Sequence, residues 1–305
     1  MKRIHSLQST NNTQDLSSRR YVLVTPVRDE ERYLPLTIDS VVKQTVRPAE
    51  WVIVNDGSRD STPQIIDDAT RSYSWIRAVH RSDRGYRQSG GGIVAAFLEG
   101  LKTLQTRDWG FLCKLDGDLS FDPRFFESAL QKLEDDPTIG IGGGVLYYHR
   151  EDGRRVLETH PRFHVRGAVK IYRRACWDAM DGLWSGPGWD TVDEVKANML
   201  GWRSRSFFDL PMTHHRPTGA TCGRWGGVVK DGRIDYVVGY HPLFMLAKCA
   251  RRLKSWPYVV ASGAMLCGFL SGYLKRLPRV NDPKLIGYLR RQQMNRLLGR
   301  ESIWK

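Results

Sequence analysis

Two carboxylates lie one residue apart in the segment Lys114-Leu115-Asp116-Gly117-Asp118, directly after the apolar residues 110–113. A strand that ends in Asp-x-Asp holds two oxygen donors at its C-terminal tip. Hard cations such as Mg²⁺ and Mn²⁺ prefer oxygen ligands, and they commonly bind one or two carboxylates together with substrate phosphates. The alternative is a simple turn, because Asp and Gly both favour turns. The residues upstream of this segment bear on the choice.

The chain upstream alternates between short apolar runs and amphipathic stretches. The apolar runs predict strands over residues 21–27, 51–54, 76–80 and 111–115. Helices are expected over 28–42, from about residue 63, and over 93–104. This rhythm implies a parallel sheet, in which ligands bind beyond the carboxyl ends of the strands. Residues that follow strand ends should therefore meet in one crevice, namely Thr25, Pro26, Asp56, Asp116 and Asp118.

Three segments together resemble the consecutive signatures of the family 2 inverting glycosyltransferases, which have the GT-A fold. They are TPVRDE at residues 25–30, VNDGSRDST at 54–62 and LDGD at 115–118. The resemblance covers roughly residues 20–220, and the second segment is its most specific part. It implies an α/β fold with a Rossmann-like, mostly parallel sheet flanked by helices. It also implies a nucleotide-diphosphate sugar as donor and a divalent metal, Mg²⁺ or Mn²⁺, as cofactor.

The resemblance assigns roles to individual positions. The residues expected to line the base and the ribose are Thr25, Pro26, Arg28 and Glu30. Asp56 would hydrogen-bond the base or the ribose, while Gly57 and Ser58 let the backbone approach it. Asp116, followed by Gly117, would bind ribose or metal, and Asp118 would bind the metal that bridges the diphosphate.

The chain departs from the family pattern at Gly90-Gly91-Gly92, where many members carry a Lys or Arg among small residues. Arg84 and Arg87 lie just before and could supply that charge near the phosphates. Alternatively, Gly91 and its neighbours present backbone N–H groups at a helix N-terminus, which is itself an anion site. A flexible loop without a ligand is the third possibility.

An inverting transfer needs a carboxylate that deprotonates the acceptor hydroxyl. A helix with acids near its start is expected after the Gly/Pro-rich residues 186–188, ending at Gly201. Asp190 lies eleven residues before Gly201-Trp202, about where the family places an acidic pair, although the first acid of that pair is here a tryptophan. We expect Asp190 to be the base, with Asp193 and Glu194 as alternatives. Helix capping would explain one of these acids well and three of them poorly.

Two adjacent histidines, His214 and His215, follow in a loop near the expected metal. Adjacent side chains in an extended chain rarely point the same way, so at most one of them would bind the metal. We expect His215 to be the third metal ligand.

The net charge of +14 is concentrated near the C-terminus, where residues 241–305 hold 13 Lys/Arg and 2 Asp/Glu. This argues for an anionic membrane surface as partner and against nucleic acid. Residues 255–274 carry no charge and would span about 30 Å as a helix. Their proline, glycines and basic flanks oppose spanning. We expect interfacial or re-entrant helices, with the basic amphipathic residues 244–254 and 285–298 beside them. A soluble helical subdomain is the alternative.

The expected organisation is a disordered leader (1–19), a GT-A domain (20–235) and a basic, apolar helical tail (236–305). The domain divides into a nucleotide-binding half (20–120) and an acceptor and catalytic half (121–235). Five scattered cysteines favour a reducing compartment, and no signal peptide is visible. We therefore expect a peripheral or monotopic protein on the cytoplasmic side of a membrane.

Three functions are compatible with these features. The first is hexosyl transfer, with inversion, to a hydroxyl of a glycan or lipid-linked acceptor in surface polysaccharide or glycolipid synthesis. The second is a polyprenyl-phosphate sugar synthase. The third is of another class, namely a catalytically inactive, transferase-like protein that binds a nucleotide or serves as a scaffold.

Overall fold

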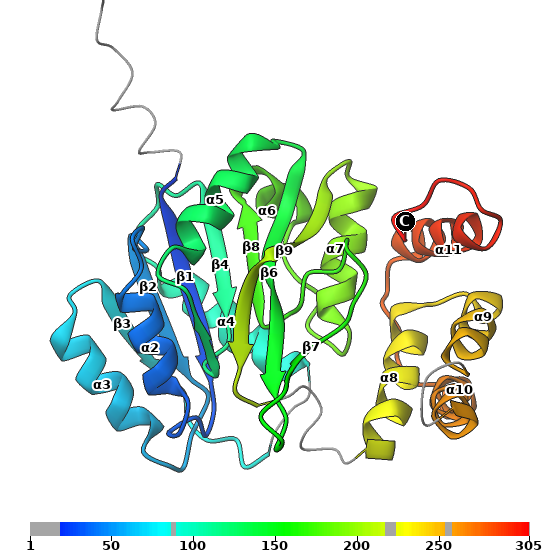
Figure 1. The fold of residues 1–305 in the computed structure, drawn as a ribbon, viewed down its shortest axis with the longest axis horizontal. Helices are drawn as coiled ribbons and strands as arrows, with labels where there is room; N and C mark the ends of the chain where they lie inside the picture. The colour runs from blue at the N-terminus through cyan, green and yellow to red at the C-terminus, as the bar shows by residue number, and fades with distance from the viewer. Residues whose placement is uncertain (1–18, 87–89, 217–223, 254–257, 305) are drawn as a thin grey trace, which may run out of the picture.

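The computed structural model describes residues 19–86, 90–216, 224–253 and 258–304. Four parallel strands form one half of its sheet, in the order β3-β2-β1-β4 (Figure 1). They are β1 (Tyr21–Val27), β2 (Glu50–Asn55), β3 (Ile76–His80) and β4 (Phe111–Leu115). The four strands predicted from the sequence are therefore confirmed. Residues of β1, β2 and β4 are buried on both faces, which is why these segments read as continuous apolar runs.

The other half of the sheet is mixed. Next to β4 lies β8 (Val169–Arg173), antiparallel to it, followed by β6 (Ile139–His149), β9 (Arg203–His214) and β5 (Leu119–Phe121). The short β7 (Arg155–Leu157) pairs with β6. The strand–helix rhythm thus correctly predicted parallel pairing in the first half of the sheet. In the second half, β6 and β9 pair in parallel.

Helices cover both faces of the sheet. The core on one face includes residues of α2 (Leu34–Val42), α3 (Thr62–Ser72) and α5 (Phe125–Asp135). The core on the other face includes residues of α4 (Gly91–Thr103), α6 (Arg174–Met180) and α7 (Trp189–Met199). Alternate residues of β1 and β2 contribute to the two cores, as expected for a side-chain period of two.

The first helix begins later than predicted. Residues 28–33 form a loop, because the Glu30 carbonyl accepts hydrogen bonds from the backbone N–H groups of Tyr33 and Leu34 and closes a turn there. Asp29 has the left-handed φ of 54°, which ends the regular chain after β1. The acidic residues 29–31 therefore lie in this loop rather than in the first turn of α2.

Four helices follow the sheet domain: α8 (Arg224–Val238), α9 (Pro242–Arg252), α10 (Tyr258–Leu274) and α11 (Pro283–Leu297). They lie beside α7 (Figure 1), and their core includes Val192 and Val195 of that helix. α8 packs along α10, so these two helices belong to the same helical unit. Within the described residues, no helix combines the length and apolar character needed to cross a bilayer.

Candidate active site

The loops that follow β1 and β2 are tied together by reciprocal hydrogen bonds. The Ser58 hydroxyl accepts a bond from the Asp29 N–H at 2.9 Å, and the Asp29 carboxylate accepts one from the Arg59 N–H at 3.0 Å. The Thr62 hydroxyl likewise accepts from the Glu30 N–H at 2.8 Å. Much of the signature at residues 54–62 therefore holds the two loops in shape. This applies to Ser58, which was predicted to bind the donor.

Thr25 and Pro26 are buried within β1. The Thr25 hydroxyl accepts a hydrogen bond from the Trp51 indole N–H at 2.9 Å, inside the core beneath α2 and α3. The structure thus gives Thr25 a packing role at the strand end.

Asp56 lies in a cluster of arginines at the end of β2. Its carboxylate accepts bonds from Arg81 at 2.6 Å and from both terminal nitrogens of Arg84. Arg28 donates to the Asp56 carbonyl at 3.1 Å. Three predicted donor-side residues, Arg28, Asp56 and Arg84, are therefore adjacent, and Arg84 contacts Asp56 where a phosphate contact was expected. Arg87 lies outside the described residues.

Gly57 and Gly91 have geometric reasons to be small. Gly57 has a φ of 73°, and a Cβ at this position would lie 2.5 Å from the Asp83 Cα. Gly91 is the buried first residue of α4, and Gly90 just ahead of it packs against Pro187 in the loop before α7. The glycine run thus brings α4 close to the segment that carries the expected base.

Asp116 and Asp118 follow β4, as predicted, with Gly117 buried under Val27 between them. Asp116 forms an ion pair with the buried Lys114, and its backbone N–H donates to the Ala168 carbonyl at 2.8 Å. Burial raises the pKa of Asp116, and the Lys114 ammonium opposes that shift.

Asp118 is 8% exposed and only partly satisfied. Its Oδ2 lies 3.5 Å from His214 Nε2 and 3.7 Å from Arg216 Nε. Its Oδ1 is buried and has no hydrogen-bond partner among the described residues. Arg216 also pairs with Glu30, whose pKa is raised to about 7 by burial and by the nearby Asp118. An unpaired buried carboxylate oxygen is costly, so this atom is the natural position for a ligand.

The two histidines diverge at the end of β9. His214 bridges Asp118 and Glu158, with 2.7 Å between His214 Nδ1 and Glu158 Oε1. Burial alone would lower the pKa of His214, but these two carboxylates raise it to about 9. His215 instead lies 2.9 Å from the Ser120 hydroxyl and stacks on Tyr33. The histidine whose side chain pairs with the Asp118 carboxylate is thus His214, whereas the side chain of His215, the predicted metal ligand, contacts Ser120 and Tyr33.

The residues present are compatible with a divalent cation that shares its coordination with a substrate. Within the described chain, no group of three or more His, Cys, Asp or Glu side chains forms a complete metal site. Asp118 Oδ1 nevertheless offers a buried oxygen without a partner, and Asp116 lies two residues away. Mg²⁺ and Mn²⁺ commonly bind in this way, with one or two carboxylates completed by phosphate oxygens and water.

The three candidate bases near the start of α7 differ sharply in environment. Lys170 donates to the Asp193 carboxylate at 2.7 Å and to Glu194 at 3.0 Å, and all three side chains are fully buried. Tyr172 also donates to Asp193 at 2.6 Å, while the Val165 N–H donates to Glu194. His164 Nδ1 lies 2.9 Å from the second oxygen of Glu194, so every oxygen of these two carboxylates has a partner.

Asp190 is only partly buried, and no other described side chain hydrogen-bonds to its carboxylate. Burial alone would raise its pKa, but the charges of His164 and Lys170 outweigh that effect and hold the pKa below the usual 3.8. A Cβ at Gly167 would lie 3.2 Å from Asp190 Oδ2, so glycine leaves room for this carboxylate.

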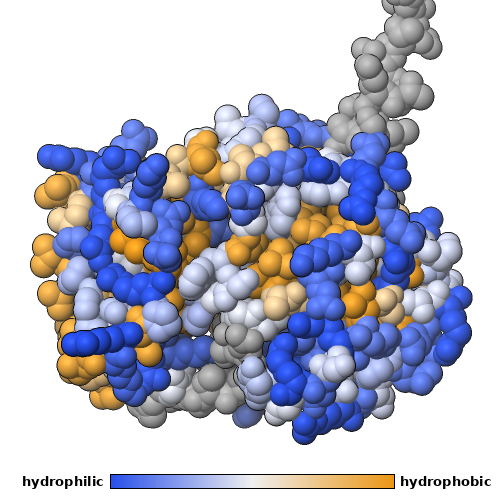
Figure 2. Space-filling view, turned by 180° about the vertical axis from the view of Figure 1, so that it is seen from behind, coloured by the Kyte–Doolittle hydropathy of each residue, from blue (hydrophilic) through white to orange (hydrophobic). Residues whose placement is uncertain are grey.

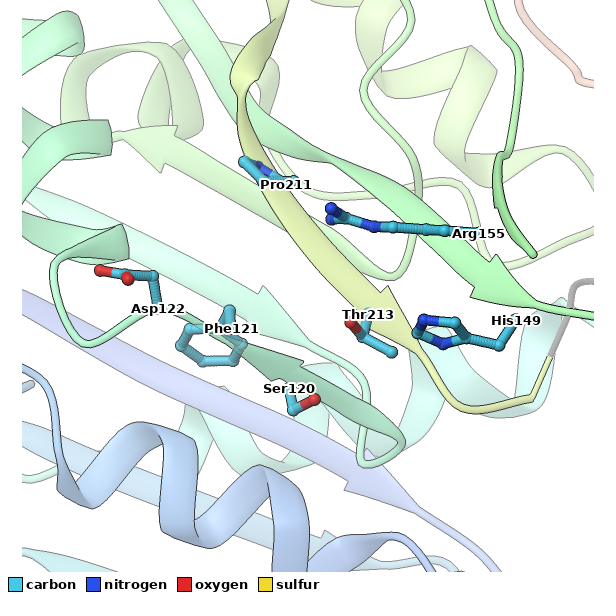
Figure 3. A pocket seen from close by; sticks show the side chains of 7 residues that line it. All are labelled: Ser120, Phe121, Asp122, His149, Arg155, Pro211 and Thr213. Carbon is cyan, nitrogen blue, oxygen red and sulfur yellow. The ribbon is translucent and has the colours of Figure 1, made fainter. Parts of the chain in front are cut away.

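A shallow cleft of about 440 Å³ opens next to the metal side of the site (Figure 3). It lies between the strands β5 and β9 and the β6–β7 hairpin, and it is lined by Ser120, Phe121, Asp122, His149, Arg155, Pro211 and Thr213. The Ser120 hydroxyl joins it to His215. Its hydroxyl and charged groups suit a polar ligand.

The half-parallel, half-mixed sheet, with Asp-x-Asp after β4, has the arrangement expected of a GT-A protein from the three sequence segments. The model of the family "Glycosyl transferase family 2" matches residues 22–185, and the chain belongs to this family. It is 30% identical over 218 residues to the putative glycosyltransferase EpsH of Bacillus subtilis, covering 64% of this chain and 60% of that protein. The uncharacterized glycosyltransferase EpsJ of the same species is 27% identical over 133 residues, or 44% of this chain and 35% of EpsJ. The chain thus spans less than two thirds of these relatives.

Solved structures agree on the fold. The mannosyltransferase PcManGT of Pyrobaculum calidifontis, solved with GDP-Man and Mn²⁺, superposes with a TM-score of 0.54 at 15% identity over 93% of this chain and 76% of its own. S. aureus TarS 1–349, solved with UDP-GlcNAc, also gives 0.54, at 16% identity over 88% and 79%. These likenesses confirm the GT-A fold that the three sequence segments implied.

Proposed function

We propose that this protein transfers a hexosyl group from a nucleoside-diphosphate donor to an acceptor hydroxyl, with inversion. The observation that carries the proposal is the buried Asp118 Oδ1, which has no hydrogen-bond partner in the part of the chain that the structure describes. It lies at the strand end where parallel sheets bind ligands. Family membership and the fold shared with proteins solved with GDP-Man or UDP-GlcNAc support a nucleotide sugar as donor.

Asp118 and Asp116 would hold the divalent metal, which would neutralise the charge that develops on the leaving diphosphate. Mn²⁺ in the PcManGT structure supports this assignment. His214, charged at neutral pH, donates toward Asp118 and orients it, so we assign the supporting histidine to His214 in place of His215. Arg28, Asp56 and Arg84 form a polar cluster suited to the base and ribose of the donor.

Asp190 is the proposed base. Its low pKa leaves it ionised at neutral pH, the form that accepts a proton. The acceptor hydroxyl gives its proton to Asp190 while its oxygen attacks the anomeric carbon from the face opposite the diphosphate. The bond to the diphosphate then breaks with its electron pair on the leaving oxygen, which inverts the anomeric centre. Asp193 and Glu194, saturated by Lys170, support the helix that carries Asp190.

The direct test is calorimetric binding of UDP, GDP and dTDP, with Mn²⁺ and with EDTA, to wild type and to Asp118→Asn. Asp118→Asn preserves the shape of the side chain but removes the charge that a cation needs. We expect one nucleotide to bind in a metal-dependent manner to the wild type and that binding to be lost in the variant. If the folded wild type binds none of the three, the protein is a scaffold rather than a transferase of this kind.

A second candidate differs only in its acceptor, a polyprenyl phosphate. A phosphate is already ionised at neutral pH and needs no base. This hypothesis therefore predicts that Asp190→Asn keeps most of the activity, whereas transfer to a hydroxyl predicts its loss. A glycan or lipid-linked hydroxyl is favoured because Asp190 is present, ionised and without another described partner.

We further propose that the helical unit contacts an anionic membrane surface, as expected from the sequence. Apolar side chains lie along the outer edge of the molecule on the side of these helices (Figure 2). In α10 the exposed apolar side chains follow one stripe, which includes Leu270. Val259 and Leu274 in this stripe are 70% and 85% exposed. In α9 they are Leu243 and Leu246, at 54% and 50%, with Leu253 just beyond.

Basic residues border this apolar stripe. Arg251 lies at the end of α9, and Lys275 and Arg276 follow α10, all exposed. Apolar side chains that enter the interface and cations that meet lipid head groups form the usual pattern of a peripheral membrane helix. Such a protein would lie on the anionic, cytoplasmic leaflet, in reach of a lipid-linked acceptor for surface polysaccharide or glycolipid synthesis.

Flotation with vesicles tests this placement independently of catalysis. The wild type should float with vesicles that contain anionic lipid and less with neutral vesicles. A Val259→Ser/Leu274→Ser variant should float less with both. As a matched control, Leu36→Ser changes an apolar side chain of α2 that is 43% exposed and should float like wild type. Equal flotation of all three proteins would exclude this surface as the docking site.

A further inference from the structure

Two buried lysines face each other across neighbouring strands. Lys114 of β4 and Lys170 of β8 are direct partners in the antiparallel register and are 1% and 0% exposed. Like charges directly opposite each other destabilise a strand pair, and a buried charge is costly unless it is paired. Such a pair persists only where the surrounding groups compensate both ammonium ions.

Trp189, the first residue of α7, contacts both lysines. The Nζ atoms of Lys114 and Lys170 each lie 5.5 Å from the centroid of its ring. The face of an indole ring attracts cations at this distance. Trp189 is itself 7% exposed, and its ring would lie 2.9 Å from a Cβ at Gly167, so it is tightly enclosed.

Each lysine holds a different side of the proposed site. Lys114 pairs with the Asp116 carboxylate and donates to the Gly167 carbonyl at 2.5 Å. Lys170 donates to the Asp190 carbonyl at 2.6 Å and to the carboxylates of Asp193 and Glu194. One ammonium group therefore orients the donor side, and the other fixes the backbone of the proposed base.

We propose that Lys114, Trp189 and Lys170, hereafter the bracket, fix the separation between Asp116 and Asp190. They are positioning residues, because each acts through a carboxylate or a backbone group and not on the substrate. The indole couples the two sides: moving α7 away from the sheet would weaken its contact with both ammonium groups together. The inference rests on the proposed function, since a set distance between metal side and base matters only if a sugar is transferred between them.

The test compares Trp189→Leu with Trp189→Phe. Leu removes the aromatic face, whereas Phe keeps a smaller one that still attracts cations. The probes are UDP and GDP with Mn²⁺ for binding, and release of nucleoside diphosphate from UDP-GlcNAc and GDP-Man for turnover. Trp75→Phe, on the far side of β2 beside Trp51, is the matched control.

We expect Trp189→Leu to lower kcat by about tenfold to a hundredfold, the cost of a misplaced reacting group. Nucleotide affinity should stay within about twofold, because the cations that Trp189 contacts are Lys114 and Lys170, neither of which is predicted to bind the donor. Trp189→Phe should restore part of the rate, and Trp75→Phe should match wild type. Lys114→Met and Trp189→Leu should be non-additive in kcat, because they act on one unit.

Wild-type turnover by a stably folded Trp189→Leu would overturn the bracket while leaving the proposed function intact. The bracket would also be overturned if the rate fell only in proportion to the loss of folded protein, as measured by thermal unfolding. In that case Trp189→Phe would recover no rate, and the effects in the double variant would be additive. A wild type that neither binds nor turns over any probe would overturn the proposed function itself, and the role of the bracket with it.

Discussion

Two clusters of acids near the centre of this molecule look alike in the sequence and differ in the structure. Asp116 and Asp118 follow β4, and Asp193 and Glu194 lie in α7, and a buried lysine accompanies each pair. The oxygens of the α7 pair all have partners, whereas Asp118 Oδ1 has none among the described residues. A saturated buried acid contributes to the scaffold, and an unsaturated one indicates where a ligand binds. Asp190, four residues before Glu194, escapes saturation and belongs with the second kind.

The sharpest test of this distinction is the variant Asp190→Asn. Removal of a general base typically costs about 10²–10⁴-fold in rate. We expect that loss in kcat for Asp190→Asn, with metal-dependent nucleotide binding unchanged, because Asp190, as the proposed base, would act on the acceptor and not on the donor. The measurement is steady-state release of nucleoside diphosphate in the presence of acceptor.

Asp178→Asn is the control for this experiment, since Asp178 is an exposed acid of α6 that pairs with the nearby Arg174. It should behave as wild type. A variant Asp190→Asn that keeps more than a tenth of the wild-type rate would contradict the assignment and favour a phosphate acceptor.

The second test concerns the saturated cluster and measures stability. Removing one partner of a buried ion pair leaves an uncompensated charge and costs about 3–5 kcal/mol. We expect Lys170→Met to lower the free energy of unfolding by about that amount, because Asp193 would lose its cation and Glu194 would be left with His164 as its ionic partner. Urea denaturation measures the change.

A double variant, Lys170→Met/Asp193→Asn, removes one charge of each sign and should recover a large part of the loss. If Lys170→Met costs less than about 1 kcal/mol, the value typical of an exposed pair, the cluster is not the scaffold described here.

The sequence predicted this site where local rules suffice. The four strands of the parallel half are short apolar runs, and each places its polar successor at the same sheet edge, so Asp56, Asp116 and Asp118 could be located from periodicity alone. The resemblance to family 2 transferases then supplied the fold, which the comparisons confirm.

What the sequence could not predict depends on contacts between distant segments. Which histidine reaches Asp118 is decided by the register of β9 against β5, where His214 lies opposite Leu119. The lysine pair exists because β8 runs antiparallel to β4, a pairing that local periodicity does not reveal. The hydroxyl groups of Thr25 and Ser58 were expected to lie near a bound donor. In the structure they accept hydrogen bonds from the Trp51 indole and the Asp29 N–H instead.

The smallest effect, and the most discriminating, is the pH dependence of turnover. A carboxylate accepts a proton only when ionised, so the rate falls about tenfold for each pH unit below the pKa of the base. Asp190 has a pKa held below 3.8, which predicts no loss from the base between about pH 5 and 8. Burial raises the pKa of Asp193 to about 6, so with that residue as base the pH–rate profile would fall on the acid side below about pH 6.

Glu30, with a pKa of about 7, can add a fall of its own to the pH–rate profile. Repeating the profile in Glu30→Gln removes that contribution. A fall below about pH 6 that persists in Glu30→Gln would move the base from Asp190 to Asp193 and place a saturated acid at the centre of the chemistry.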